Sequence, residues 1–231
     1  MIAILGAMQA EVDSLIREIV DLKQEEAGGF DFYRGSICGH DVVVARCGVG
    51  KVNAAACTQA LLTAYHPELV VNTGVAGSLS PKLDILDVAV ATDAVQHDYD
   101  TTGLGEPAGA LSINGKLVTY LPCDALWRDR LIIAAEQIGV RAIPARVASG
   151  DQFITHREDK RRIMEAFGAL ACEMEGAAIA QVCYLHHTPC AILRVISDST
   201  DEAHSMEFTT FIGKAVEISF NILMRFLESI Q

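Results

Sequence analysis

The stretch Cys190–Ser197, CAILRVIS, decides the fold class, because its apolar residues do not alternate with polar ones as in a half-buried strand. A strand is continuously apolar when helices cover both faces of its sheet. Arg194 interrupts the run, and Asp198 follows it directly. A buried arginine needs a carboxylate partner, and Glu11 or Glu175 could supply it. The stretch therefore predicts a helix-covered sheet with a polar site at one strand end.

Similar apolar runs recur along the chain and alternate with stretches of helical periodicity. The other predicted strands are Ile2–Met8, Phe32–Ile37, Val42–Cys47, Leu69–Thr73, Asp87–Val95 and Val140–Ser149. The predicted helices are Ala10–Ile19, Lys51–Tyr65, Asp124–Ile138 (capped by Asp124 or the residue before it), Glu158–Phe167, Glu175–His187 and Phe208–Ile230. This alternation predicts one α/β domain over residues 1–231.

The composition argues against several classes of protein. With 231 residues, 51% of them hydrophobic, the chain can bury a large core. No run approaches the ~20 apolar residues of a membrane span, and the N-terminus does not resemble a signal peptide, so we expect a cytoplasmic protein that binds no membrane. The net charge of −12 disfavours nucleic acid as a partner. We interpret the basic run Lys160–Arg162 as the solvated face of a helix.

The seven cysteines show no paired spacing, which is typical of reduced, mostly buried thiols. Cys183, His186, His187 and Cys190 form a metal-like cluster, but their spacing matches no tetrahedral zinc pattern. We interpret them as a helix end followed by a strand, and we expect no metal.

Three predicted strand ends carry a carboxylate, namely Glu11, Glu175 and Asp198. Ligands of helix-covered sheets bind where strand ends and helix N-termini meet. If the chain is extended before the helix begins, Glu173 points to the same side as Glu175. Carboxylates in different environments suit cleavage of a glycosidic bond, because one donates a proton to the leaving group while another activates water.

Glycine-rich segments follow two of the strands. Gly48–Lys51 lacks the GxxxxGK[ST] spacing of a phosphate loop and is interpreted as a close-packed turn into a helix. Asn72–Ser78 is interpreted as a turn whose backbone amides cradle a ligand. Phe153, in the loop after Ser149, is either a core residue or a surface on which a ligand stacks.

These segments, taken in order, resemble the 5′-methylthioadenosine/S-adenosylhomocysteine nucleosidases of the nucleoside phosphorylase superfamily. The resemblance covers nearly the whole chain and rests on Ile4–Met8 with Glu11, Cys47–Val52, Asn72–Gly74, Ser149–Ile154, Glu173–Ala178 and Arg194–Asp198. It implies a three-layer α/β/α sandwich with a central mixed β-sheet, a homodimer and no cofactor. It also implies hydrolysis of methylthioadenosine and S-adenosylhomocysteine, and of 5′-deoxyadenosine, in methionine salvage and the recycling of S-adenosylmethionine by-products.

The resemblance also implies roles for individual residues. Asp198 would donate a proton to N7 of adenine, and Glu11, helped by Arg194, would deprotonate the attacking water. Glu175 would bind the ribose hydroxyls with Met174 packed against the sugar. The residues implied to bind substrate are Met8, Val49, Val75, Ala76, Gly77, Phe153 (stacked on the purine), Ile154 (reading the purine edge), Glu173, Met174, Glu175, Ser197 (positioning Asp198) and Phe208 (in the 5′ pocket with Met8 and Val49).

Two departures leave the 5′-substituent open. Val75 stands where members often have a serine near the water. Leu104 and Glu106 stand in a loop where members often use aromatic residues, partly donated by the dimer partner. Methylthio, homocysteinyl, deoxy and futalosine-type substituents all remain possible.

Two other functions compete with hydrolysis. A purine nucleoside phosphorylase would gather arginines around phosphate, whereas the acid at Glu11 repels it and Arg17 and Arg46 form no cluster. The second competitor is a non-enzymatic nucleoside-binding protein on the same fold.

Overall fold

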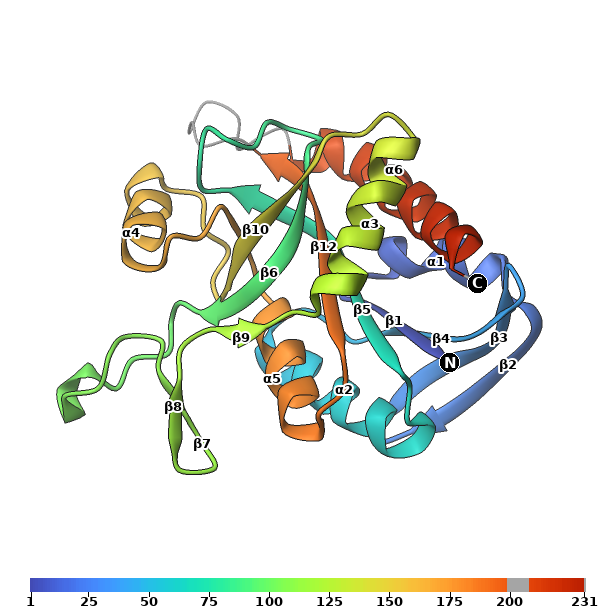
Figure 1. Ribbon diagram of the computed structural model, residues 1–231, viewed down its shortest axis with the longest axis horizontal. Coiled ribbons are helices and arrows are strands. Elements are labelled where there is room, and N and C mark those ends of the chain that lie inside the picture. Colours follow the sequence, from blue (N-terminus) through green and yellow to red (C-terminus); the bar gives the residue numbers. More distant parts are fainter. Residues whose placement is uncertain (199–207, 231) are drawn as a thin grey trace.

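The structure is a computed structural model that describes residues 1–198 and 208–230, with only the backbone given for residues 208–211. Ten strands form one mixed sheet in the order β11-β10-β6-β12-β5-β1-β4-β3-β2, with β9 paired to β6 (Figure 1). These strands are β1 (Ile2–Gly6), β2 (Val20–Ala27), β3 (Phe30–Ile37), β4 (His40–Arg46), β5 (Leu69–Ser78), β6 (Val88–Gln96), β9 (Leu121–Pro122), β10 (Ala142–Ser149), β11 (Ala171–Glu173) and β12 (Cys190–Asp198).

One end of the sheet closes on itself through β11. β11 is parallel to β10 and also pairs antiparallel with β5. Since β5, β12, β6 and β10 are neighbours in that order, the five strands form a closed ring. β12 is the centre of this arrangement, parallel to β5 on one side and antiparallel to β6 on the other.

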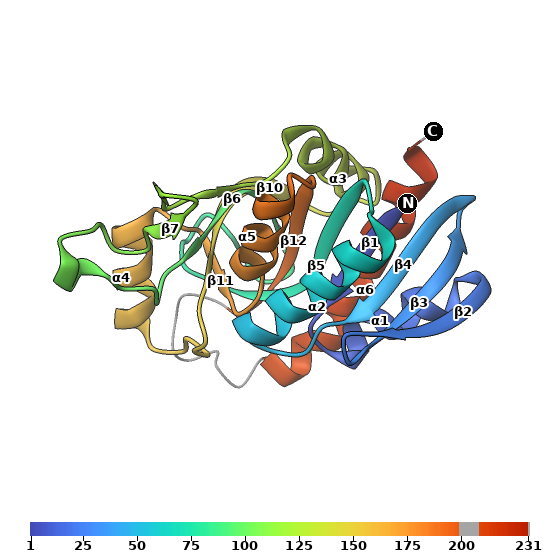
Figure 2. The same cartoon turned by 90° about the horizontal axis from the view of Figure 1, so that it is seen from below.

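Helices cover both faces of the sheet, as expected (Figures 1 and 2). On one face, α2 and α5 pack together and bury alternate strand residues such as Ala3 and Leu5. On the other face, α1, α3 and α6 cover Ile2 and Ile4. The helices are α1 (Gln9–Arg17), α2 (Lys51–Tyr65), the 3-10 turn η1 (Thr102–Leu104), α3 (Ala125–Gln137), α4 (Arg157–Phe167), α5 (Gly176–His186) and α6 (Phe208–Ser229).

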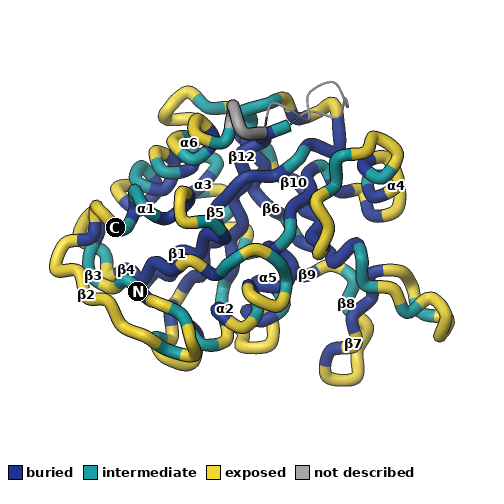
Figure 3. The backbone as a smooth tube through the Cα atoms, turned by 180° about the vertical axis from the view of Figure 1, so that it is seen from behind, coloured by how far each residue is buried: buried dark blue, intermediate teal, exposed yellow. Residues whose placement is uncertain are grey.

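The three-layer α/β/α fold with a mixed sheet is therefore confirmed, and the central strands are buried along their length (Figure 3). The predicted helices agree with the structure to within two residues at each end, and Asp124 caps α3 by accepting from two backbone N–H groups. None of the described helices is long and apolar enough to cross a membrane.

Several of the observed strands were not predicted from the sequence. β2, VDLKQEEA, is exposed along nearly all its length and lies at the sheet edge, where charged residues protect the open strand. β11 and the hairpin of β7 (Leu111–Ile113) with β8 (Lys116–Val118) have only three residues per strand. Segments this charged or this short carry no periodic hydrophobic signal.

The prediction that Asn72–Ser78 forms a turn was wrong. β5 continues as a strand to Ser78, because β12 pairs with it as far as Gly77 and β11 pairs with its last two residues. The glycines that suggested a turn instead bring the strand backbone close to neighbouring side chains.

Candidate active site

A cavity of about 230 Å³ lies where β1, β5 and β12 end and α1 and α5 begin. Its lining residues are Ala7, Met8, Glu11, Val49, Val75, Ala76, Gly77, Gln152, Phe153, Ile154, Cys172, Glu173, Met174, Glu175, Arg194, Ser197 and Asp198. These include every site residue expected from the sequence except Phe208, whose side chain lies outside the described residues. Sequence reasoning missed Ala7, Gln152 and Cys172, although each is a chain neighbour of an expected residue.

Glu11 is held at the first turn of α1. The backbone N–H groups of Ala7 and Met8 donate to Glu11 Oε2 at 2.8 and 2.9 Å. Burial raises the pKa of Glu11, and the positive charge of Arg194 and the backbone donors lower it only in part. A buried carboxylate with a raised pKa is a stronger base than a solvated one.

Arg194 is fully buried among acceptors. Its Nη2 contacts Glu173 Oε2 and Asn72 Oδ1, and lies 3.5 Å from Glu175 Oε2. Glu175 was one expected partner, but the nearest carboxylate is Glu173, and Glu11 acts on the arginine only through its charge. Burial alone would lower the pKa of Arg194, but the three carboxylates raise it, so the guanidinium remains charged.

Both carboxylate oxygens of Glu173 accept hydrogen bonds from other groups of the protein. Oε1 accepts from Ser149 Oγ and from the Gly176 N–H at 3.0 Å, while Oε2 accepts from the Glu175 and Gly176 N–H groups at 3.0 and 2.8 Å. Glu173 therefore lies in the cavity wall and ties Arg194 to the start of α5.

Glu175 connects α5 to the glycine turn before α2. Its Oε1 accepts the Gly50 N–H at 2.9 Å, and Gly48 and Gly50 have φ of +84° and +95°, which favours glycine at both positions. The turn is close-packed, as its sequence indicated. Burial, followed by the charge of Glu173, raises the pKa of Glu175 to about 7.

Asp198 ends β12 and forms an ion pair that the sequence did not suggest. Its Oδ2 lies 2.5 Å from Lys160 Nζ, and Ser197 Oγ lies 3.4 Å from Oδ1. The prediction that Lys160 lies on a solvated face was wrong, because it shares the buried face of α4 with Ile163 and Phe167. Arg161 and Arg162 are exposed, as expected.

Two glycines of β5 make room for these groups. A Cβ on Gly74 would collide with Arg194 Nη1 and lie 2.8 Å from Glu11 Oε1. A Cβ on Gly77 would lie 2.8 Å from Asp198 Oδ1. Gly74 and Gly77 lie three residues apart on β5, about 10 Å along the strand, and Glu11 and Asp198 both line the cavity.

The apolar part of the cavity wall is partly open. Phe153 is 62% exposed and Val49 is 48% exposed, although both line the cavity. Phe153 is therefore no core residue, and its role as a surface on which a ligand stacks stays a prediction. Leu104 is 81% exposed and Glu106 accepts from Thr101 Oγ1 at 2.7 Å, and neither lines the cavity.

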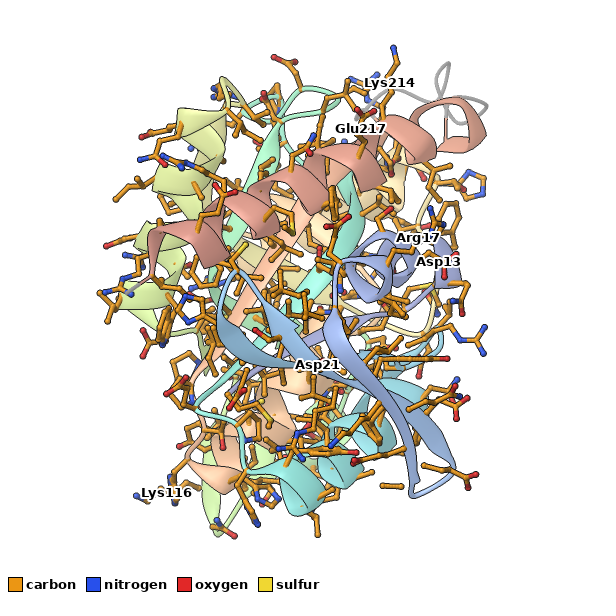
Figure 4. The ribbon with its side chains drawn as sticks, turned by 90° about the vertical axis from the view of Figure 1, so that its right-hand side faces the viewer. Asp13, Arg17, Asp21, Lys116, Lys214 and Glu217 are labelled. Atoms are coloured by element: carbon orange, nitrogen blue, oxygen red, sulfur yellow. The ribbon has the colours of Figure 1, made fainter. Side chains whose placement is uncertain are left out.

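Among the described residues, Arg194 is the arginine that lines the cavity. Arg17 and Arg46 are exposed and do not line it. Figure 4 shows Arg17 near Asp13 on α1, at the molecular surface. Within residues 1–198 and 208–230, no group of three or more His, Cys, Asp or Glu side chains is placed to hold a metal ion.

Comparison with known proteins finds a matching family and full-length relatives. A family model described as the phosphorylase superfamily matches residues 1–228. An aminodeoxyfutalosine nucleosidase of Campylobacter jejuni is 32% identical over 229 residues, covering 99% of each chain. A 5′-methylthioadenosine/S-adenosylhomocysteine nucleosidase of Staphylococcus carnosus is 36% identical over 235 residues, covering the full length of each chain.

A solved structure shares the fold closely. The 5′-methylthioadenosine/S-adenosylhomocysteine nucleosidase of Neisseria meningitidis, in complex with methylthio-immucillin-A, superposes with a TM-score of 0.92. It is 32% identical and 99% of each chain is covered.

Proposed function

Because the chain belongs to the 5′-methylthioadenosine/S-adenosylhomocysteine nucleosidases of the phosphorylase superfamily, which are N-glycosyl hydrolases, we propose that it hydrolyses adenine nucleosides with a 5′-thio substituent. The observation that carries this proposal is the cavity itself. It brings Glu11, Glu175 and Asp198 together from three strand ends, around the buried Arg194. The products are adenine and the 5′-thioribose.

Asp198 is the proposed general acid. Adenine leaves readily only if the electron pair of the broken C1′–N9 bond is neutralised, and a proton on N7 does this. A carboxyl group at the end of β12, on the cavity wall beside Ser197, can donate that proton.

Glu11 is the proposed general base. Its Oε2 accepts two backbone N–H groups, and the carboxylate accepts a further hydrogen bond from the Val75 backbone, so the protein holds it in the cavity wall, where it can take a proton from the attacking water. The raised pKa of Glu11 makes it a better proton acceptor. Arg194 carries a positive charge beside it and lowers the energy of the hydroxide that forms.

Glu175 is proposed to bind the ribose hydroxyls, with Met174 packed against the sugar. Positive charge develops on the ribose as the glycosidic bond breaks, so an anionic carboxylate stabilises the transition state more than the ground state. The Gly50 N–H fixes one oxygen of Glu175, which directs the other toward Arg194 and the cavity.

The remaining lining residues suit a purine and an apolar 5′ group. Phe153 offers an exposed ring for stacking, and the backbone of Ile154 can read the purine edge. Met8 and Val49 line the cavity on the side of the glycine turn, where Phe208 is proposed to join them. Val75, Ala76 and Gly77 form the floor of the cavity on β5.

Phosphorolysis is disfavoured by charge. Arg194 is the sole arginine lining the cavity in the described part of the chain, and its guanidinium already contacts Glu173, Asn72 and Glu175. A phosphate placed next to Glu11 would meet a carboxylate without a free cation to offset the repulsion.

A futalosine-type nucleoside is the second candidate substrate. One full-length relative is named an aminodeoxyfutalosine nucleosidase. The cavity is partly open beside Val49 and Phe153, so a longer 5′ substituent could extend toward solvent. We propose that the enzyme acts in the cytoplasm as a homodimer, in methionine salvage and the recycling of S-adenosylmethionine by-products.

Adenine release from four nucleosides tests the proposal. The substrates are methylthioadenosine, S-adenosylhomocysteine, 5′-deoxyadenosine and aminodeoxyfutalosine, each assayed with and without phosphate. We expect the two thio-nucleosides to have the highest kcat/KM and phosphate to have no effect. A strict phosphate requirement would refute hydrolysis, and a preference for aminodeoxyfutalosine would establish the second candidate.

A further inference from the structure

A second cavity, of about 530 Å³, adjoins the active-site cavity. The two cavities share Ala7, Met8 and Val49 in their walls. They therefore meet on the side where the 5′ group of the nucleoside is proposed to lie. Val49 is 48% exposed at this junction, so a 5′ substituent longer than the first cavity would extend past it into the second.

Arg46 is the charged residue of this second cavity. The other described residues of its wall are apolar or carry neutral polar groups, such as the side-chain amides of Gln9 and Asn53. Burial raises the pKa of the Cys47 thiol, so this group also stays uncharged. Among the described residues, the wall thus presents a cation and no carboxylate, which favours an anionic ligand over a cationic one.

The guanidinium of Arg46 is available to a ligand. Arg46 is the last residue of β4, and its side chain is exposed. Arg128, Arg141 and Arg146 each form an ion pair with an aspartate. Within residues 1–198 and 208–230, Arg46 makes no such pair and donates no side-chain hydrogen bond. A planar guanidinium with free N–H groups binds a carboxylate through two parallel hydrogen bonds.

Resting on the proposed function, we propose that the second cavity is a subsite for the far end of the 5′ substituent. In this subsite Arg46 selects nucleosides whose substituent ends in a carboxylate. The apolar stem of the substituent passes Met8 and Val49, and its carboxylate pairs with the Arg46 guanidinium. A methylthio group ends before the subsite, whereas homocysteinyl and futalosine-type groups carry a carboxylate several bonds farther from C5′.

This role has a kinetic signature. The carboxylate is remote from the breaking C1′–N9 bond, so its pairing with Arg46 stabilises the bound substrate and the transition state equally. Loss of such an interaction raises KM and leaves kcat nearly unchanged. The pair is partly solvated, so salt should weaken it. A residue that only packs against the cavity would not discriminate between charged and uncharged substituents.

The test compares kcat/KM for S-adenosylhomocysteine with kcat/KM for methylthioadenosine, which serves as the reference substrate within each protein. In Arg46→Met we expect this ratio to fall roughly fivefold, mainly through KM of S-adenosylhomocysteine. Arg46→Glu should lower it further, because repulsion replaces attraction. Arg17→Met is the matched control, since Arg17 is an exposed arginine that lines neither cavity.

Two further substrates identify the group that Arg46 recognises. The methyl ester of S-adenosylhomocysteine lacks the negative charge, so its kcat/KM should be insensitive to Arg46→Glu and to salt. Aminodeoxyfutalosine bears its carboxylate on a different stem. If the carboxylate alone is recognised, its ratio to methylthioadenosine should also fall in Arg46→Met. A fall for S-adenosylhomocysteine alone would restrict the subsite to the homocysteinyl group.

The outcomes separate this inference from the proposed function. An unchanged ratio in a variant that still cleaves methylthioadenosine would overturn the role of Arg46 and leave the function standing. An equal fall in Arg17→Met would also overturn it, because the effect would then belong to net charge. If the wild type releases adenine from none of these nucleosides, the proposed function has failed and the subsite falls with it.

Discussion

At the scale of single residues, Glu11 and Glu173 differ in the groups that donate hydrogen bonds to their carboxylates. Glu173 is held by side-chain and backbone donors and by Arg194, whereas Glu11 is held by the backbone N–H groups of Ala7 and Met8 and by a further hydrogen bond from the Val75 backbone. Glutamine at position 11 can accept the Ala7 and Met8 bonds through its amide oxygen. Glu11→Gln therefore removes the base and keeps these two bonds.

We expect Glu11→Gln and Asp198→Asn each to lower kcat by several orders of magnitude, since loss of one general acid or base costs roughly 10²–10⁴-fold. Binding of a non-hydrolysable nucleoside analogue, measured by calorimetry, should remain within a few-fold of wild type. Thermal unfolding of Glu11→Gln should stay near the parent value, whereas Asp198→Asn should unfold at a lower temperature because it leaves the buried Lys160 ammonium without its paired carboxylate. Unfolding of Glu11→Gln at much lower temperature would show that Glu11 is structural, and an unchanged kcat in either variant would remove that residue from the mechanism.

Glu175 gives the protein a pH dependence of stability. Its pKa is about 7 in the folded protein and near 4.5 when solvated, so folding favours the protonated form. The stability it contributes is fully present below pH 4.5 and is lost as pH rises through about 7. Glu175→Gln removes this titration, so we expect the variant to lose less Tm than wild type between pH 5 and pH 8.

Differential scanning calorimetry in matched buffers measures this difference. The pKa of Glu11 is raised in the same direction, so the slope should shrink in Glu175→Gln without disappearing. Equal slopes in the two proteins would show that Glu175 is ionised without penalty in the fold. In wild type, kcat/KM should also fall as pH drops below about 7, because Glu175 loses the charge that faces the ribose.

The sequence predicted the lining of the cavity far better than the pairing within it. Glu11, Glu175 and Asp198 could be found because each follows a buried strand, and strand ends converge in this kind of sheet. Arg194 contacts Glu173 and not Glu11. This choice depends on the register between β5 and β12 and on the backbone N–H groups at the start of α5, which hold Glu173. Lys160 was predicted to be solvated because the residues next to it in the sequence are charged, and this obscures the pattern of buried positions along α4.

At the scale of secondary-structure elements, β5 shows how local signals can mislead. Gly74 and Gly77 indicated a turn, but in the structure they keep β5 extended while two functional groups approach its backbone. The pairing of β5 with β12 and β11 outweighs the low strand propensity of glycine. The long helices and central strands were predictable because their hydrophobic periods are sustained, which the charged β2 and three-residue β11 lack.

Gly74→Ala tests this interpretation of β5. The added methyl group would collide with the Arg194 guanidinium and the Glu11 carboxylate, both of which are buried. Forcing an extra carbon into such a site typically costs about 1–3 kcal/mol of unfolding free energy. We expect that loss in urea denaturation, together with at least a tenfold lower kcat, because the base and its neighbouring cation are displaced.

Gly213→Ala, at an exposed position of α6, is the matched control for this substitution. A Cβ there meets no atom within 4 Å, so stability and activity should stay close to wild type. A fully active and stable Gly74→Ala would mean that Arg194 and Glu11 can move apart without consequence, contrary to the proposed roles.

At the scale of the whole molecule, the alternation of strands and helices was enough to predict three layers, but not which surfaces meet another chain. The segment between β6 and β7, which includes η1, extends away from the body of the protein in Figure 1. Leu104 at its end is 81% exposed. An exposed leucine on a projecting segment gains stability when a partner surface covers it. The segment is also where the nucleosidase resemblance places residues donated by a dimer partner.

We therefore expect sedimentation equilibrium to give twice the 24.8 kDa mass of the chain, and Leu104→Asp to weaken the dimer because it would bury a charge in the interface. Each subunit carries a net charge of −12, so salt should strengthen association by screening repulsion.

Leu126→Asp on α3 is the matched control, since Leu126 is 57% exposed on an element far from η1 in Figure 1. If the segment borders the partner's cavity, Leu104→Asp should also raise KM for methylthioadenosine at concentrations where the variant is still dimeric. A monomeric wild type at micromolar concentration, or equal dissociation of the two variants, would contradict this assignment.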